Sequence, residues 1–345
     1  MTGWIYDIAR EQSPREDHLR ELFLRSQDAG YSAIGLYLEH RYAYPSAPWA
    51  SGPGSLTPEL INRLQSDPEL SKLRIVPFLN TLGHMEGFIR TEGGEWLAEG
   101  PGQGFLQLCP SRKECADFAW DLVSDAMEAF DDEWVHLGGD EAKQLGQCHY
   151  CSERVKSVGV AGLYGEYYGE MCQRVLNYGR RPCLWGDMLT KFPEALKAIP
   201  KETVIFDWNY SGPPSETTHM LREQGFDVVC CPALRTYDAG WCFLDETCKT
   251  IDAHMEEAQR WGALDVWVCA WEFFGFSSFL SIVPLIFAVG RHIKIGEEWN
   301  VAIQSAGGEG YVYAAEVLGK KFPSTSLFLS PGTRRSLRES FVLGG

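Results

Sequence analysis

The sequence has no cluster of basic residues. Its 31 Lys and Arg are outnumbered by 47 Asp and Glu, which gives a formal net charge of −16. Nucleic acids and anionic membrane surfaces are bound through basic patches. We therefore expect neither nucleic acid nor a membrane surface as a partner.

A secretion signal and a long apolar run are also missing. The first ten residues, MTGWIYDIAR, carry an acid and a base and have no apolar signal core. The most apolar stretch, residues 273–290, is interrupted by Gly, Ser and Pro. It is typical of a buried strand end followed by a core helix rather than of a membrane span. These features predict a soluble, cytoplasmic protein.

Cysteine pairs at metal-binding spacing are scarce. The 11 Cys form an odd number, and without a secretion signal reduced thiols are expected. CHYC at 148–151 could supply half of a zinc site, but no second C-x-x-C occurs, so Cys109, Cys115 or His149 would have to complete it. Ordinary reduced thiols are favoured, and we predict no bound metal and no cofactor.

The chain contains a repeating pattern of apolar and amphipathic segments. Apolar residues make up 45% and charged residues 23%, as in globular proteins. Amphipathic stretches at 14–30, 113–130 and 163–179 have apolar residues at helical spacing. The runs rich in β-branched or aromatic residues predict strands at 4–9, 33–39, 74–80, 134–139, 182–187, 203–208, 227–232 and 265–271.

Eight apolar strands that alternate with helices predict a (β/α)8 TIM barrel. A doubly wound open sheet is the main rival, but no G-x-G-x-x-G follows the first strand. No linker rich in Pro or Ser divides the chain. We predict a single domain, with the catalytic barrel over 1–297 and a C-terminal extension over 298–345 that packs on it.

A TIM barrel carries its catalytic groups where the strands end and in the loops that follow. Polar and aromatic residues recur at these positions, which scattered surface charge would not explain. They are Asp7, Arg10, Glu39, His84, Asp140, Glu141, Trp185, Asp187, Trp208, Tyr237, Trp271 and Glu272.

The segment WVHLGGDEAK (134–143) places two acids side by side at one of these ends. Neighbours in a strand point to opposite faces, so Asp140 and Glu141 can serve one substrate only if the chain leaves the strand, which Gly138 and Gly139 permit. Two close carboxylates resist double ionisation, so one tends to keep its proton. Such a pair suits cleavage of a glycosidic bond, while the alternative is a capping pair at a helix start.

The segment HLGGDE closely resembles the H-x-G-G-D-E signature of family 20 glycoside hydrolases, the β-N-acetylhexosaminidases. Other segments agree in order over roughly residues 4–290. YDIAR resembles the family's D-x-x-R, whose arginine, here Arg10, binds the C3 and C4 hydroxyls. LNTLGH resembles the segment that ends in Gly-His, here His84. LWGDM resembles the W-x-D segment, and Trp208 and Trp271 fall where the family has its other pocket tryptophans.

The resemblance implies a substrate-assisted mechanism in which the 2-acetamido oxygen of the sugar attacks the anomeric carbon and forms an oxazolinium ion. Asp140 would orient the acetamido group. Glu141 would protonate the leaving oxygen and then deprotonate water. Tyr237 would bind the acetamido oxygen, and the walls of the sugar pocket would be Trp185, Trp208 and Trp271. Glu39 and His84 would form a relay behind Glu141.

The chain departs from the family pattern in three places. Glu272 directly follows Trp271, where larger members have Trp-x-Glu, and Asp238 directly follows Tyr237, where one residue usually intervenes. The N-terminal α+β domain common in the family does not precede the first strand. The chain thus resembles the compact members, with long loops at 40–55 and 85–105 on the active face.

Two other functions compete with an exo-acting hexosaminidase on terminal GlcNAc or GalNAc. One is a sugar-binding barrel without turnover, for which an acid catalyst would be unnecessary. The other is a metal-dependent hydrolase that uses Asp140, Glu141, His84 and His136, although His136 lies inside a strand. Barrels of this kind can form homodimers, but no stripe in the sequence identifies an interface.

Overall fold

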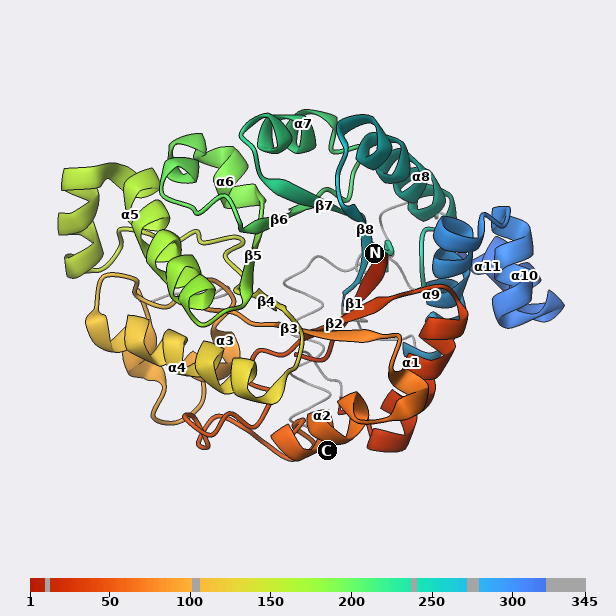
Figure 1. Ribbon diagram of the computed structural model, residues 1–345, viewed down its shortest axis with the longest axis horizontal. Helices are drawn as coiled ribbons and strands as arrows, with labels where there is room; N and C mark the ends of the chain where they lie inside the picture. The colour runs from red at the N-terminus through yellow and green to blue at the C-terminus, as the bar shows by residue number, and fades with distance from the viewer. Residues whose placement is uncertain (10–12, 101–105, 237–240, 272–278, 321–345) are drawn as a thin grey trace.

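The structure is a computed structural model that describes residues 1–9, 13–100, 106–236, 241–271 and 279–320. Each strand pairs in parallel with the next, and β8 pairs with β1 to close the barrel (Figure 1). This confirms the predicted (β/α)8 barrel. The strands are β1 Gly3–Asp7, β2 Ala33–Tyr37, β3 Arg74–Phe78, β4 Trp134–His136, β5 Arg181–Trp185, β6 Val204–Trp208, β7 Asp227–Cys231 and β8 Asp265–Ala270.

The helices surround the barrel and cover the outer face of its sheet (Figure 1). The three helices expected from sequence are present as α1, α4 and the second half of α5. The last begins earlier than expected and is broken at Gly159, where φ is 74°. The helices are α1 Glu16–Asp28, α2 Pro58–Gln65, α3 Glu86–Ile89, α4 Lys113–Ala129, α5 His149–Asn177, α6 Asp187–Lys191, α7 Ser215–Glu223, α8 Leu244–Trp261, α9 Val283–Gly290, α10 Trp299–Gly307 and α11 Glu309–Leu318.

Aromatic side chains fill the interior of the barrel. The rings of Phe78 and Phe206 lie 5.4 Å apart, and Trp267 lies 5.4 Å from Phe206. Gly35 makes room for them, because a Cβ at this position would lie 2.4 Å from the Phe78 ring. The interior is thus a packed core, as in other TIM barrels, and a substrate must bind above the carboxyl ends of the strands.

Helices α10 and α11, within residues 299–318, pack on the outside of the helical ring beside α9 (Figure 1). Trp299 donates a hydrogen bond to Asp252 of α8 (3.1 Å), and the Tyr311 hydroxyl donates to the Ser281 carbonyl (2.6 Å). The boundary at 297/298 stays a prediction. Within the described ranges, no helix is both long enough and apolar enough to cross a membrane.

Candidate active site

The acid pair follows a sharp turn at the end of β4. The strand stops at His136, and the chain then turns through Gly138 (φ 78°) and Gly139 (φ 100°). A Cβ at Gly138 would lie 2.7 Å from the Leu79 carbonyl oxygen, so a larger residue would collide with backbone. The chain therefore leaves the strand just before Asp140, as the glycines predicted.

A histidine from the loop after β3 joins the two acids. The Nε2 atom of His84 lies 3.3 Å from Asp140 Oδ2 and 3.4 Å from Glu141 Oε2. The other oxygen of Asp140, Oδ1, is buried and accepts no hydrogen bond from the described residues. The structure thus brings together three residues that the sequence placed on two separate strand ends.

Backbone strain is concentrated in the same place. In the described part of the chain, the non-glycine residues with positive φ are Glu39 (42°), His84 (54°) and Glu141 (46°). Each such conformation costs about 1–3 kcal/mol and persists where surrounding contacts enforce it, which is common at functional sites. All three follow strand ends and were predicted as site residues.

Glu141 is ionised in the substrate-free protein. Its hydrogen bond with His84, and then that with Lys143, outweigh burial and lower the pKa of Glu141 to about 2. The Lys143 ammonium lies 2.7 Å from Glu141 Oε1. The proton that a close acid pair is expected to keep is therefore not on Glu141 in the free protein, because the contacts with His84 and Lys143 stabilise its ionised form.

Beside the acid pair, the carboxyl group of Asp187, the first residue of α6, has a raised pKa. Burial, and then the negative charge of Asp140, raise the pKa of Asp187 to about 7. Its Oδ2 atom accepts a hydrogen bond from the Glu141 backbone N–H (3.0 Å), and Oδ1 accepts one from Trp208 Nε1 (3.4 Å). Asp187 therefore holds both the backbone of Glu141 and the indole ring of Trp208.

Aromatic side chains at and just after the ends of β6 and β8 lie above the barrel core. Trp271 Nε1 donates a hydrogen bond to the Tyr210 hydroxyl (2.7 Å), and the Tyr210 ring stacks on Trp208 at 4.9 Å. Sequence reasoning missed Tyr210, although its position two residues after Trp208 was a usable signal. Trp185 is fully buried and packs against Trp271 at 5.9 Å, so it lacks the exposed face that a pocket wall needs.

Glu39 is almost completely buried, with 4% exposure. Its Oε1 atom accepts a hydrogen bond from the Gly87 backbone N–H (2.8 Å), and Oε2 lies 3.7 Å from His40 Nδ1. These contacts join the loop after β2 to the loop that carries His84. The relay from Glu39 through His84 to Glu141 stays a prediction.

Four predicted site residues lie outside the described residues, so their roles stay predictions. They are Arg10, Tyr237, Asp238 and Glu272. Asp7, the last residue of β1, is buried and accepts a hydrogen bond from the Ala9 backbone N–H (3.1 Å).

His136 points into the barrel core, away from the position that a metal hydrolase would require. Its ring stacks on Phe78 at 4.2 Å, and Nδ1 accepts a hydrogen bond from the Gly138 backbone N–H (3.1 Å). Burial holds the pKa of His136 well below its usual range. Among the described residues, the side chains that could bind a metal ion lie elsewhere. They are Glu99, Cys109, Cys148 and Cys151, whose donor atoms lie within 4.8 Å of one another.

Several solved structures with the same fold are β-N-acetylhexosaminidases or β-N-acetylglucosaminidases. A β-N-acetylhexosaminidase from Bacteroides fragilis superposes with a TM-score of 0.68 at 15% identity, over 93% of this chain and 72% of that one. An exo-β-N-acetylglucosaminidase from Vibrio harveyi, solved with N-acetylglucosamine, gives a TM-score of 0.69 at 16% identity, over 93% and 58%. A β-N-acetylhexosaminidase from Streptomyces coelicolor gives 0.66 at 15% identity, over 94% and 70%. At these identities the likeness establishes the fold.

Sequence comparison identifies the family. No curated protein sequence gives a significant match. The catalytic-domain profile of glycosyl hydrolase family 20 matches residues 81–264, which include His84, the acid pair and Asp187. With the barrel and the strained acid pair in place, this match shows that the chain belongs to glycosyl hydrolase family 20 and is a glycoside hydrolase.

Proposed function

We propose that the protein is an exo-acting β-N-acetylhexosaminidase that removes terminal β-linked GlcNAc or GalNAc with retention of configuration. The observation that carries this proposal is that the His84 side chain contacts both Asp140 and Glu141, and that His84 and Glu141 have strained backbone conformations. Family membership and the N-acetylglucosamine bound in the Vibrio harveyi relative support a 2-acetamido sugar as substrate.

Asp140 and Glu141 have different roles in this mechanism. The carbonyl oxygen of the substrate's acetamido group attacks the anomeric carbon, while Glu141 gives a proton to the leaving oxygen. Asp140 accepts a hydrogen bond from the acetamido N–H and stabilises the positive charge that develops on that nitrogen. Glu141, now ionised, takes a proton from the water that opens the oxazolinium ion.

The lowered pKa of free Glu141 means that substrate binding must protonate it. The Lys143 side chain is 54% exposed, so an incoming leaving group can displace it from Glu141. Loss of that ion pair and exclusion of water both raise the pKa of a carboxyl group. We propose that the bound sugar and its aglycon make Glu141 an acid in this way.

Assays on paired substrates test the proposed activity. The purified protein should hydrolyse p-nitrophenyl β-GlcNAc or β-GalNAc and leave the matching β-glucoside intact, because that sugar has a 2-hydroxyl and no acetamido nucleophile. Glu141→Gln should abolish turnover of both amino sugars. Glu170→Gln, an exposed acid on α5, is the matched control and should keep full activity.

Binding measurements with the same proteins separate catalysis from recognition. Isothermal titration with GlcNAc should show that Glu141→Gln still binds the sugar. Sugar binding by the wild type with no turnover of either amino sugar would contradict the proposal and favour a sugar-binding barrel.

A further inference from the structure

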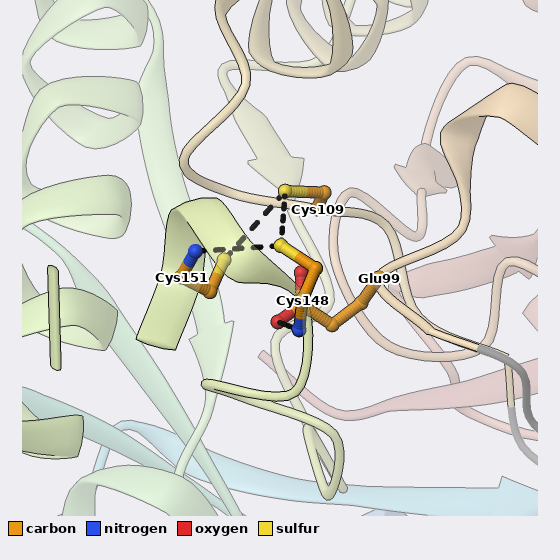
Figure 2. A group of neighbouring side chains, drawn as sticks. All are labelled: Glu99, Cys109, Cys148 and Cys151. Atoms are coloured by element: carbon orange, nitrogen blue, oxygen red, sulfur yellow. Dashed lines mark hydrogen bonds between the residues drawn. The ribbon is translucent and has the colours of Figure 1, made fainter. Parts of the chain in front are cut away.

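A second cluster of reactive side chains joins the loop after β3 to the start of α5. Cys148 and Cys151 lie at the N-terminus of α5, while Glu99 and Cys109 come from the loop between α3 and α4. Figure 2 shows the three sulfur atoms pointing toward one another, with the carboxyl group of Glu99 beside Cys148. One donor atom from each of the four residues lies within 4.8 Å of the others.

The sulfur positions match those of thiolates around one metal ion. Cys109 Sγ lies 3.4 Å from Cys148 Sγ and 3.6 Å from Cys151 Sγ. Tetrahedral zinc with Zn–S bonds of about 2.3 Å holds its sulfur ligands about 3.8 Å apart. The Cys151 backbone N–H donates to Cys148 Sγ (3.3 Å), a contact that fixes one sulfur atom in place.

Glu99 has one oxygen that is held by the backbone and one that is not. Its Oε1 atom accepts hydrogen bonds from the backbone N–H groups of Gln147 (3.0 Å) and Cys148 (3.1 Å). Its Oε2 atom is buried and accepts no hydrogen bond from the described residues, in a side chain with 1% exposure. A buried carboxylate oxygen among thiols is costly unless a cation binds it.

We propose that Glu99, Cys109, Cys148 and Cys151 bind one structural zinc ion. Three thiolates and a carboxylate supply the four ligands of a closed tetrahedral site, which leaves no open position for catalysis. The backbone contacts of Glu99 Oε1 orient the carboxylate so that Oε2 faces the ion. The guanidinium of Arg112 lies beside Cys109 and offsets part of the excess negative charge.

Two residues that the sequence offered as further ligands do not belong to this site. The Sγ atom of Cys115 lies 3.8 Å from the Leu97 carbonyl oxygen and is outside the group, and His149 is exposed on α5. Glu99 was missed because it lies 49 residues before Cys148 in sequence. Cys115 therefore provides a matched control for the ligand cysteines.

The zinc ion would hold together the two loops that supply the catalytic residues. The loop that carries Glu99 and Cys109 contacts the segment that follows Glu141, where the Gln144 backbone N–H donates to Gln107 Oε1 (3.0 Å). The same loop pairs with the His84 region through the Leu108 N–H and the Leu82 carbonyl (2.8 Å). The ion thus acts on the positions of the loops and not on the substrate.

Metal analysis of the full-length protein tests this site. Protein purified under reducing conditions should contain about one zinc per chain by inductively coupled plasma mass spectrometry, as a single four-ligand site requires. Cys148→Ser, Cys109→Ser and Glu99→Gln should each lower the zinc content, while Cys115→Ser should keep it. Circular dichroism and gel filtration on each variant identify any that fail to fold.

Two measurements on the wild type make the test independent of the variants. An organomercurial that titrates thiols should release the zinc as three thiolates react. Replacement with Co²⁺ should give the strong visible absorption of a tetrahedral site together with a sulfur-to-cobalt charge-transfer band. A reduced protein that takes up neither ion in stoichiometric amount would overturn the proposal, as would a disulfide among these cysteines under reducing conditions or zinc that persists in all three ligand variants. Each of these outcomes is independent of whether the enzyme hydrolyses amino sugars.

Discussion

Carboxylate side chains at the two ends of the barrel have different neighbours. At the end where the strands begin, Asp132 binds Arg74 through two hydrogen bonds of 2.7 and 2.6 Å, and Asp227 contacts both Arg181 and Arg222. At the end where the strands finish, Asp140, Glu141 and Asp187 crowd together. At the first end these two acids are paired with cations and stabilise the fold, while the second end keeps acids close for chemistry.

The pKa values of Asp227 and Asp187 follow this difference. The hydrogen bond from Arg181 lowers the pKa of Asp227, whereas burial and Asp140 raise that of Asp187. Backbone strain also separates the two ends, because the positive φ values of Glu39, His84 and Glu141 all occur after strand ends. Substitutions at the two ends should therefore affect different properties.

The largest effect should come from Asp140→Asn. If Asp140 orients the acetamido nucleophile as proposed, its loss should lower kcat/KM by about 10²–10³-fold, as removal of a group that stabilises transition-state charge does in other enzymes. Stability should hold or rise, because one of the crowded negative charges is removed. Kinetics with p-nitrophenyl β-GlcNAc and chemical denaturation on the same samples measure both.

The exposed Asp28 of α1 provides the control for this change, since Asp28→Asn should alter neither property. A destabilised Asp140→Asn protein with normal turnover would contradict the division between the two ends.

The next largest effect should come from Arg74→Met, which should lower stability and leave activity unchanged. Asp132, only 4% exposed, would be left as an unpaired buried charge, which costs about 3–5 kcal/mol. The free energy of unfolding from urea denaturation should fall by roughly this amount. The remaining folded protein should keep its kcat, and a drop in kcat at unchanged stability would argue against a structural role for this ion pair.

A smaller effect should appear in the pH dependence of stability through Asp187. Because its folded-state pKa is raised to about 7, the folded protein binds more protons at this group than the unfolded chain between about pH 4 and pH 7. This contribution makes stability fall as pH rises through that window, by up to about 1.4 kcal/mol per pH unit. Asp187→Asn should flatten that slope.

Urea denaturation of the wild type and Asp187→Asn at several pH values across the window measures the difference in slope. Equal slopes in the two proteins would show that Asp187 is ionised throughout and that Asp140 does not repel it.

The smallest effect is expected at Lys143→Met. Removal of the ammonium should raise the pKa of Glu141 from about 2, although His84 still holds it below its usual range. At a pH above the pKa, an increase of one pKa unit makes the protonated fraction of Glu141 about ten times larger. We therefore expect kcat/KM to rise by less than about tenfold. Lys156→Met, which removes an exposed ion pair with Glu153, should leave the pH profile unchanged.

A lower kcat/KM for Lys143→Met across the whole pH range would mean that this lysine assists catalysis rather than holding the resting form of Glu141.

The barrel could be predicted from sequence because strands buried on both faces appear as continuous apolar runs. The turn that carries the acid pair could be predicted because Gly138 and Gly139 allow the chain to adopt positive φ at the strand end, and because HLGGDE is specific. The lowered pKa of Glu141 could not be predicted from sequence, because it depends on contacts with His84 and Lys143 that form only when the loops fold. The proximity of Glu99 to the three cysteines could not be predicted either, because the fold alone brings these residues together.

A series of substrates with increasing fluorination of the N-acetyl group tests the central claim most directly. If the acetamido oxygen is the nucleophile held by Asp140, kcat/KM should fall steadily as fluorine withdraws electrons from that oxygen, while KM changes little. A rate that does not depend on fluorination would contradict substrate assistance and would require a nucleophile from elsewhere in the site.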